Sequence, residues 1–190
     1  MKNLFYNIVK QKIKFNVVGC QSDSPGSQTM IFVNCINFWN HTERSATPLM
    51  IASETGQLDV LKLLICSRAH LDNAEVGTGR TALMLAIENC HVDVARCLVD
   101  AGANLEVENE EGLTALALAC GNGSLEVVKL LLEVELRAEP DMRSNPVRSK
   151  LAHFKQCLVV AHRAGHQPVA RLVRAAITAL SEAGKELKAI

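Results

Sequence analysis

Aromatic residues are scarce in this chain, and most of them lie near one end. They make up 4% of the 190 residues, whereas hydrophobic residues of all kinds make up 48%. Six of the seven aromatic side chains fall within residues 1–40. The core of the remaining chain must therefore consist mainly of leucine, valine and alanine. The length suits one domain or a short array of repeats.

Long apolar runs and phosphate-binding loops are also missing. No stretch of 18 apolar residues occurs, which excludes a conventional membrane-spanning helix. Neither G-x-x-x-x-G-K-[ST] nor G-x-G-x-x-G is present, so nothing indicates a nucleotide or dinucleotide cofactor. The short run Gly121-Asn122-Gly123-Ser124 reads as a turn between two helices. We therefore expect no cofactor and no catalytic residue.

The cysteines do not form a recognisable framework. Seven are present, an odd number, and no C-x-x-C pair occurs. Cys66, Cys97, Cys120 and Cys157 fall in or beside apolar helical runs, where cysteine packs as a small hydrophobe. This pattern favours reduced core thiols and predicts an intracellular, cytoplasmic protein, with the nucleus as the alternative.

The net charge of zero hides an uneven distribution. Residues 1–40 carry about +3, residues 41–133 about −8, residues 134–150 about +1 and residues 151–190 about +4. The acidic central part repels nucleic-acid phosphates. We therefore expect no nucleic-acid binding through residues 41–133.

Residues 1–40 differ from the rest in composition. Met1 to Val18 is basic and apolar, but lysines interrupt it, so it lacks the clean apolar core of a secretory signal. A poorly ordered leader is the first interpretation. A targeting role, or a cap formed by Met30 to Trp39 over the end of the following structure, are the alternatives.

One hexapeptide recurs at a nearly fixed spacing. Thr47-Pro48-Leu49-Met50-Ile51-Ala52 returns as Thr-Ala-Leu-Met-Leu-Ala from Thr81 and as Thr-Ala-Leu-Ala-Leu-Ala from Thr114. The intervals are 34 and 33 residues. Self-similarity at one period indicates stacked supersecondary units. Each threonine suits the N-cap of a helix, because its hydroxyl can accept an orphan backbone N–H.

Each unit continues through a turn into a second helical pattern. The turns lie at Gly56, Cys90 and Gly123. The second helices then begin with an acid, followed by apolar residues around a single base, which predicts amphipathic helices with one solvent-facing stripe. The acids and bases are Asp59 and Lys62, Asp93 and Arg96, and Glu126 and Lys129. Gly102 fits a left-handed cap closing the second unit.

These three copies resemble ankyrin repeats, whose 33-residue unit carries T-P-L-H-x-A. The resemblance implies an all-α fold, an ankyrin-repeat solenoid of stacked helix-turn-helix units with short β-turn fingers. Within residues 41–133 the units run, by register, over about 42–73, 76–106 and 109–139.

The copies depart from the family pattern in three ways. The histidine of the motif is replaced by Met50, Met84 and Ala117, so the family's Thr–His hydrogen bond is absent. The turn glycine is Arg68 in the first unit and Glu135 in the third. The glycine before the threonine is Ser45 in the first unit. The outer units therefore diverge, as expected where they face something other than a standard neighbour.

Residues beyond the third copy predict a loop and one more unit. Residues 134–150 contain two prolines and seven charges and read as an inserted loop. Residues 151–190 read as a divergent fourth repeat with a C-terminal capping helix. Ala161 matches the last alanine of the hexapeptide, Gly165-His166 matches the turn, and Pro168 stands where the other units have their acid.

By resemblance, the chain is expected to be a non-catalytic protein–protein interaction module, a scaffold or an adaptor. Proteins of this family bind other proteins through the concave face and the fingers. An alternative is a fragment of a larger ankyrin-repeat regulatory or signalling protein. The family's variable surface positions fall here on Arg44, Ala46, Glu54, Thr55, Gly77, Thr78, Arg80, Glu88, Asn89, Glu110, Glu111, Leu113, Gly121 and Asn122.

Two local clusters suggest more specific chemistry. Glu106, Glu108, Glu110 and Glu111 form the densest acidic run, which reads either as a solvated finger or as a contact site for a partner with a basic surface. His162 and His166, with His153 and the nearby cysteines, raise a remote alternative of a metal-binding or enzymatic protein. It is disfavoured because Gly165 interrupts the helix that would align the two imidazoles. Cys90-His91 has no evident third group that would make it a catalytic pair.

Overall fold

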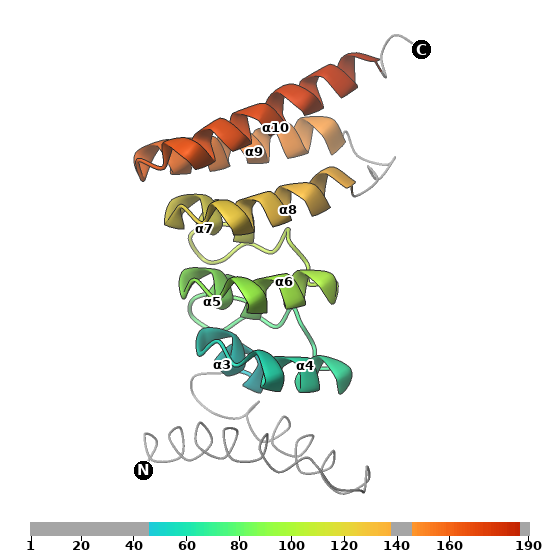
Figure 1. Cartoon of the computed structure of the whole chain (residues 1–190), viewed down its shortest axis with the longest axis vertical. Coiled ribbons are helices and arrows are strands. Elements are labelled where there is room, and N and C mark those ends of the chain that lie inside the picture. The colour runs from blue at the N-terminus through green and yellow to red at the C-terminus, as the bar shows by residue number, and fades with distance from the viewer. Residues whose placement is uncertain (1–45, 138–145, 187–190) are drawn as a thin grey trace, which may run out of the picture.

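The computed structural model describes residues 46–137 and 146–186, and these residues form eight helices and no strand. The helices are arranged in four layers, each made of two antiparallel helices (Figure 1). The pairs are α3 (Pro48–Glu54) with α4 (Leu58–Cys66), α5 (Ala82–Glu88) with α6 (Val92–Asp100), α7 (Ala115–Asn122) with α8 (Leu125–Arg137), and α9 (Pro146–Arg163) with α10 (Gln167–Glu186). The expected all-α solenoid is confirmed.

The first helices of the pairs pack on one another, and so do the second helices. We call α3, α5, α7 and α9 the inner helices and α4, α6, α8 and α10 the outer helices. Since each pair contacts mainly the pair before and after it, the apolar face of one layer is buried only by its neighbours.

The repeated threonine starts each of the first three inner helices. The hydroxyl of Thr47 accepts from the backbone N of Met50 at 3.2 Å, and Thr81 and Thr114 make the same bond at 3.4 and 3.3 Å. In the first unit the Met50 sulfur in turn accepts from the backbone N of Thr47 at 3.3 Å. The methionine that replaces the family's histidine therefore takes part in a capping box.

The turn between inner and outer helix has a left-handed residue in every layer. The φ angles are 71° at Gly56, 59° at Cys90, 72° at Gly123 and 80° at Gly165. Only glycine adopts this conformation without strain, so Cys90 is the exception. The outer helices of the first and second units are followed by Arg68 at φ 58° and Gly102 at φ 88°. Arg68 thus takes a glycine-like conformation despite its side chain.

Small aliphatic side chains form one continuous core through all four layers. Ala52, Ala86, Ala119 and Ala161 are all buried at the same place in the inner helices. An alanine there lets adjacent inner helices approach closely. Phe154 on α9 is the largest fully buried side chain.

The prediction of a loop over residues 134–150 is wrong at both ends, because the helices on either side extend into this range. Helix α8 continues through Arg137, and α9 begins at Pro146, so only residues 138–145 lie between them. Glu135 is accordingly a buried residue within α8 rather than a turn residue. The prolines and charges misled the prediction, because proline is tolerated at the first position of a helix. The chain from Ala175 onward also continues α10 as far as Glu186 and forms no separate helix there. The leader at residues 1–40 and Ser45 lie outside the described residues.

Candidate partner-binding surface

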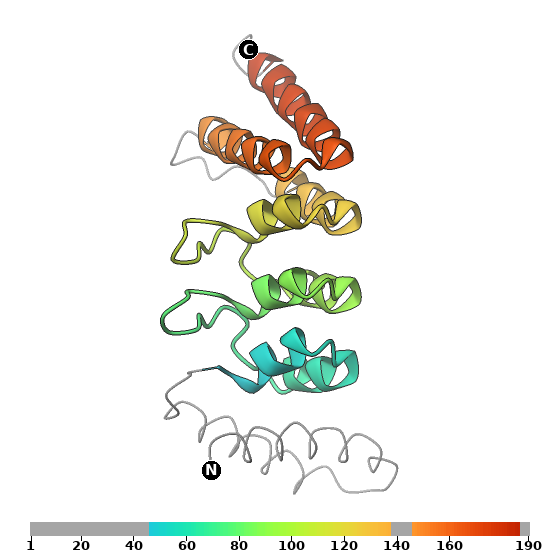
Figure 2. The same ribbon diagram turned by 90° about the vertical axis from the view of Figure 1, so that its left-hand side faces the viewer.

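Two extended connections project from the same side of the stack (Figure 2). We call residues 67–81, between α4 and α5, the first finger, and residues 101–114, between α6 and α7, the second finger. The first finger turns tightly: the backbone N of Glu75 donates to the Arg80 carbonyl at 2.9 Å, and the N of Gly79 donates to the Glu75 carbonyl at 2.9 Å. Gly77 and Gly79 have φ angles of 87° and 68°, which explains why glycine stands at both positions.

The second finger is organised by one side chain. The Asn109 Oδ1 accepts from the backbone N of Glu111 at 3.0 Å and from that of Leu113 at 2.9 Å. The backbone N of Asn109 also donates to the Leu113 carbonyl at 3.0 Å. These bonds fix the acidic segment between Asn109 and Leu113 as an ordered turn.

The two fingers are bonded to each other. The backbone N of Glu110 donates to the Thr78 carbonyl at 3.1 Å, and the backbone N of Asn104 donates to Asp72 Oδ1 at 2.8 Å. A Cβ added to Gly79 would lie 2.9 Å from the backbone N of Glu110, closer than ordinary contacts allow. The absence of a side chain at position 79 therefore lets the fingers meet and form one continuous surface.

Arg80 ties the first finger to the inner helix behind it. Its guanidinium lies 3.0 Å from a Glu75 carboxylate oxygen and 3.0 Å from a Glu88 carboxylate oxygen, and Thr78 Oγ1 donates to the same Glu75 oxygen at 2.6 Å. Burial alone lowers the pKa of Arg80, but the hydrogen bond to Glu75 and the charge of Glu88 raise it overall. Arg80, Glu88 and Thr78 are therefore engaged within the chain.

Glu110 and Glu111 differ from these paired charges. Both side chains are exposed at the end of the second finger, and neither carboxylate bonds to another residue in the described part of the chain. Val76 at the end of the first finger is 77% exposed, and Gly77 beside it is exposed too. The fingers thus present two unpaired carboxylates and an uncovered aliphatic side chain.

Three further predicted contact residues lie at the ends of the inner helices. Glu54 and Asn89 are exposed, and the Asn89 amide donates to the Leu85 carbonyl at 2.8 Å. The Asn122 amide is exposed and donates to the Ile87 carbonyl of the preceding unit at 3.1 Å. These residues extend the surface from the fingers along the row of inner helices.

The remaining predicted positions are occupied by structural contacts or are not described. Ala46 and Leu113 are partly buried against the core. Gly121 is partly buried, and a Cβ there would touch Val160 at 3.4 Å. The Thr55 hydroxyl donates to the Ile51 carbonyl at 2.7 Å. Arg44 lies outside the described residues.

In the fourth layer, the middle of α9 contacts the end of the second finger. Gln156 donates to the Gly112 carbonyl at 3.4 Å, and His153 Nε2 lies 2.7 Å from Thr114 Oγ1. The other ring nitrogen of His153 lies 3.7 Å from a carboxylate oxygen of the buried Glu135. A Thr–His hydrogen bond, absent within the units, is therefore supplied to Thr114 by the next layer. Nothing in the sequence pattern indicated this contact, which joins residues 39 positions apart.

The exposed aliphatic side chains were also missed, and the two most exposed in the described residues are Val76 and Val159. Val76 could have been identified from its place before the Gly77-x-Gly79 turn, since a residue at the end of a finger has little to pack against. Val159, on α9, is 52% exposed, and its place in an apolar helical run gave no sign of this.

The histidines of the metal alternative have other contacts. His162 Nε2 lies 3.2 Å from an Arg174 nitrogen, whereas the His166 ring lies against Gly123 of the preceding layer. No group of three or more His, Cys, Asp or Glu side chains that could hold a metal occurs among the described residues. His91 Nε2 lies 3.1 Å from the Glu54 carbonyl, and neighbouring Cys90 is an exposed turn residue.

The thiols divide by burial, and one prediction fails. Cys120 and Cys157 are buried, and Cys97 is half-buried. Cys66, predicted as a core thiol, is instead exposed, because it is the last residue of α4 and lies beyond the buried stripe formed by Val60, Leu61 and Leu64. A hydrogen bond with Cys120, together with burial, raises the pKa of the Cys157 thiol well above its usual range. Burial also raises the pKa of Cys97.

None of the helices in the described ranges is long and apolar enough to cross a membrane.

The chain is similar to several known proteins that contain ankyrin repeats. The chain is similar to the ankyrin repeat and KH domain-containing protein mask-1 of Caenorhabditis elegans, 34% identical over 136 residues, which are 71% of this chain and 5% of that protein. It is similar to the ankyrin repeat and SAM domain-containing protein 6 of Mus musculus, 32% identical over 58% of this chain and 13% of that protein. It is also similar to the NF-kappa-B inhibitor cactus of Drosophila melanogaster, 40% identical over 37% of this chain and 14% of that protein.

The chain thus spans only a small part of the length of these relatives. A family model described as ankyrin repeats in three copies matches residues 49–144 and 98–180, which together cover most of the chain. The helical stack, the capped inner helices and this match agree: the chain belongs to the ankyrin-repeat family.

Proposed function

We propose that this chain is a non-catalytic protein-binding module that engages a partner through its two fingers and the exposed ends of its inner helices. Ankyrin repeats are generally protein-interaction modules, and the relatives include a protein named as an inhibitor of NF-kappa-B. We further propose that the partner presents a basic surface. A scaffold or adaptor role follows if the partner is held without being modified.

The unpaired carboxylates of Glu110 and Glu111 carry the proposal. The carboxylates of Glu75 on the first finger and Glu88 on α5 are both paired, because Arg80 contacts each of them at 3.0 Å. The acidic pair on the second finger has no such counter-ion within the described residues, and its backbone is held in place by Asn109. Fixed charges on one finger and exposed Val76 on the finger bonded to it suit a partner with a cationic group and an apolar side chain. The charges mainly increase association rate and specificity.

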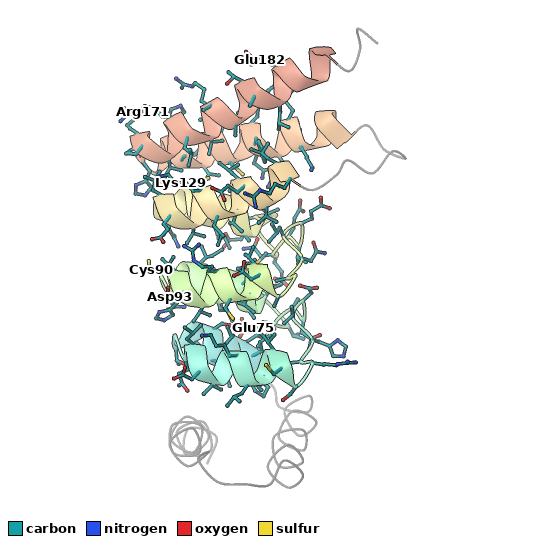
Figure 3. The ribbon with its side chains drawn as sticks, turned by 45° about the vertical axis from the view of Figure 1, so that its right-hand side comes forward. Glu75, Cys90, Asp93, Lys129, Arg171 and Glu182 are labelled. Atoms are coloured by element: carbon teal, nitrogen blue, oxygen red, sulfur yellow. The ribbon has the colours of Figure 1, made fainter. Side chains whose placement is uncertain are left out.

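The first experiment identifies the partner by position. A photo-crosslinking amino acid replaces Val76 in the full chain inside cells, and the matched control carries it at Glu182, on the opposite end of the stack (Figure 3). A protein crosslinked from position 76 and not from position 182 supports the proposal. Equal crosslinking from both positions, or none from 76, argues against it.

The second experiment tests the charges with the partner so identified. Glu110→Lys combined with Glu111→Lys should weaken binding by about tenfold or more and make it less sensitive to salt. Asp59→Lys is the matched control, because Asp59 is an exposed acid on outer helix α4. Unchanged affinity and association rate in the double variant would disprove the acidic-finger mechanism.

A second candidate, that the chain is one section of a larger regulatory or signalling protein, is supported by the coverage of the relatives. The matched regions are 5% to 14% of the three relatives described above. Detection of the endogenous protein with antibodies against α9–α10 distinguishes the two: a band well above the 20.7 kDa of this chain supports the larger protein.

The thiols support an intracellular location, which we propose with the cytoplasm as the first compartment and the nucleus as the alternative. Cys66 and Cys90 are exposed and free, and such thiols persist in reducing compartments. Imaging of the tagged chain tests this, and delivery to the secretory pathway would contradict it.

A further inference from the structure

Each of the four outer helices carries a base at the same position, and in the first three layers an acid stands three residues before it. Asp93, Glu126 and Pro168 are equivalent, since each precedes a buried valine: Val94, Val127 and Val169. In the fourth layer, therefore, proline replaces the acid. The equivalent bases are Lys62, Arg96, Lys129 and Arg171.

Between the second and third layers this pattern produces an ion pair. Arg96 on α6 lies 2.9 Å from a Glu126 carboxylate oxygen on α8. One layer further, Pro168 stands on α10 where that acid would be, so Lys129 on α8 has no carboxylate at the equivalent position. The acid alone does not ensure a pair, because Lys62 and Asp93 form none between the first and second layers. Neither Lys129 nor Arg171 forms an ion pair within the described residues.

A shallow, wide-open groove lies where the acid is missing. It is lined by Leu125, Lys129, Pro168, Arg171 and Leu172, which come from the first two turns of α8 and α10. Leu125 is 36% exposed, and Leu172 is half-buried. Figure 3 labels Lys129 and Arg171 on these two successive outer helices. The groove thus combines two cations with aliphatic side chains.

Nearby charges leave the groove positive. On the α8 side Glu126 is already paired with Arg96, and Glu133, one turn after Lys129, forms no ion pair with it. On the α10 side the first turn contains no acid, in contrast to the first turns of α4, α6 and α8, so nothing there offsets the positive end of the helix dipole. Arg174, one turn further along α10, adds another cation and is hydrogen-bonded to His162.

We infer that this groove is a second protein-docking site, which takes an acidic and aliphatic peptide segment from a partner. A carboxylate of the segment occupies the place of the missing inter-repeat acid and pairs with Lys129 and Arg171. A neighbouring leucine-like side chain packs on Leu125 and Leu172. The site lies on the outer helices and has the opposite charge to the fingers, so it is independent of the function proposed above.

The direct test uses peptides as probes. A peptide array in which Glu and Leu occupy adjacent positions is compared with the same array carrying Gln in place of Glu, and the best sequence is titrated into the isotope-labelled full chain. Saturable amide shifts at Leu125, Lys129, Arg171 and Leu172, at millimolar peptide or below, are expected only for the Glu peptide. No binding in either array, or equal binding of the Gln peptide, overturns the inference.

Charge variants test the recognition. Lys129→Glu and Arg171→Glu should each lower the affinity for the peptide by about tenfold or more. Lys62→Glu is the matched control, since it removes the same charge at the equivalent position of α4 and should leave the affinity unchanged. An equal loss with Lys62→Glu would show that only overall charge matters and would overturn the site.

Pro168→Glu provides a test that does not depend on loss of folding. This variant places the missing acid on the chain itself, so the new carboxylate pairs with Lys129. The melting temperature should then equal or exceed that of Pro168→Gln, and the peptide should no longer bind. Retained peptide binding contradicts the inference. Duplex RNA and phosphatidylserine vesicles serve as competing probes: if either displaces the peptide at lower concentration than the free peptide does, the groove is a general anion site and the peptide assignment fails.

Discussion

The imidazole of His91 lies over the backbone of Gly56, one layer earlier in the stack. Its Nε2 is 3.1 Å from the Glu54 carbonyl oxygen, and a Cβ added to Gly56 would lie 2.6 Å from its Cε1 atom. Gly56 is therefore constrained twice, by its φ angle of 71° and by the histidine of the next unit.

The same arrangement recurs between the third and fourth layers. A Cβ at Gly123 would lie 2.5 Å from the ring of His166. Between these two junctions the turn residue is Cys90, which has a Cβ, and the following unit has Ser124 in place of histidine. Where the turn residue is glycine, the next layer has a histidine at this position. Where the turn residue is Cys90, the next layer has the smaller Ser124. This correspondence makes the sequence of each turn depend on the turn before it.

Replacing Gly56 with alanine should destabilise the stack more than backbone strain alone explains. The left-handed φ costs about 1–2 kcal/mol for a residue with a Cβ, and the contact with His91 adds to it. In a His91→Ala background the cost of the contact with the His91 ring should disappear. A double-mutant cycle should therefore give a coupling energy of at least about 0.5 kcal/mol. Urea unfolding of the four proteins measures this. Strict additivity would show that the ring adapts without cost.

The repeated helix pairs and the turns between them could be predicted from the sequence, because they recur at a nearly constant period. The recurring threonine indicated the start of the first three inner helices, and the turns fell at Gly56, Cys90 and Gly123 as expected. Contacts between layers were not predictable in the same way. The His91–Gly56 and His153–Thr114 contacts join residues more than 30 positions apart, and each depends on the stacking distance and on side-chain direction.

Gly79→Ala and Gly77→Ala form a matched pair of finger variants. Both positions have positive φ, so both carry the same backbone penalty of about 1–2 kcal/mol. Only at Gly79 would the new Cβ meet the backbone N of Glu110, at 2.9 Å, whereas nothing lies near Gly77. Gly79→Ala should therefore cost about 1 kcal/mol more, the value of the Glu110–Thr78 hydrogen bond.

Hydrogen exchange measures the local effect of the finger variants. The Glu110 amide should lose protection in Gly79→Ala and keep it in Gly77→Ala. Equal protection in both variants would mean that the fingers are not held together by this bond, and would weaken the case for one continuous partner-binding surface.

The thiols should differ widely in reactivity. Cys66 and Cys90 are exposed, so iodoacetamide should label them rapidly in the native chain. Cys120 and Cys157 are buried, and the raised pKa of Cys157 keeps it protonated, so both should react only as fast as the stack opens. Peptide mapping after timed labelling separates the sites. Rapid native labelling of Cys157 would show that the α7–α9 contact opens readily.

The same thiols predict a loss of stability at alkaline pH. The folded pKa of Cys157 lies above the unfolded value of about 8.5, so the native state keeps a proton that the unfolded state loses. This contribution is fully present below the unfolded pKa and is lost as pH rises toward the folded one. The free energy of unfolding should fall by about 1.4 kcal/mol per pH unit above pH 9, and less steeply in Cys157→Ala. An identical slope in both proteins would assign the loss to other groups.

Which features of the partner-binding surface could be read from the sequence depends on what each residue contacts. Glu110 and Glu111 were found from their local acidic run, and they are exposed. Arg80 and Glu88 were placed on the surface with equal reason, yet they pair with each other at 3.0 Å. A sequence pattern locates a position on a face, but whether its charge is available depends on neighbours that the fold brings together.

His153 should anchor the fourth layer to the third. His153→Ala removes the ring that contacts both Thr114 and the buried Glu135 carboxylate, and a buried polar group left without its partner costs about 1–3 kcal/mol. His162→Ala, at an exposed site on the same helix, should cost about 0.5 kcal/mol or less. Because layers stabilise mainly their neighbours, amide protection in His153→Ala should fall in α9 and α10 and persist in α5 and α6. A uniform loss over all layers would contradict this and show that the stack unfolds as one unit.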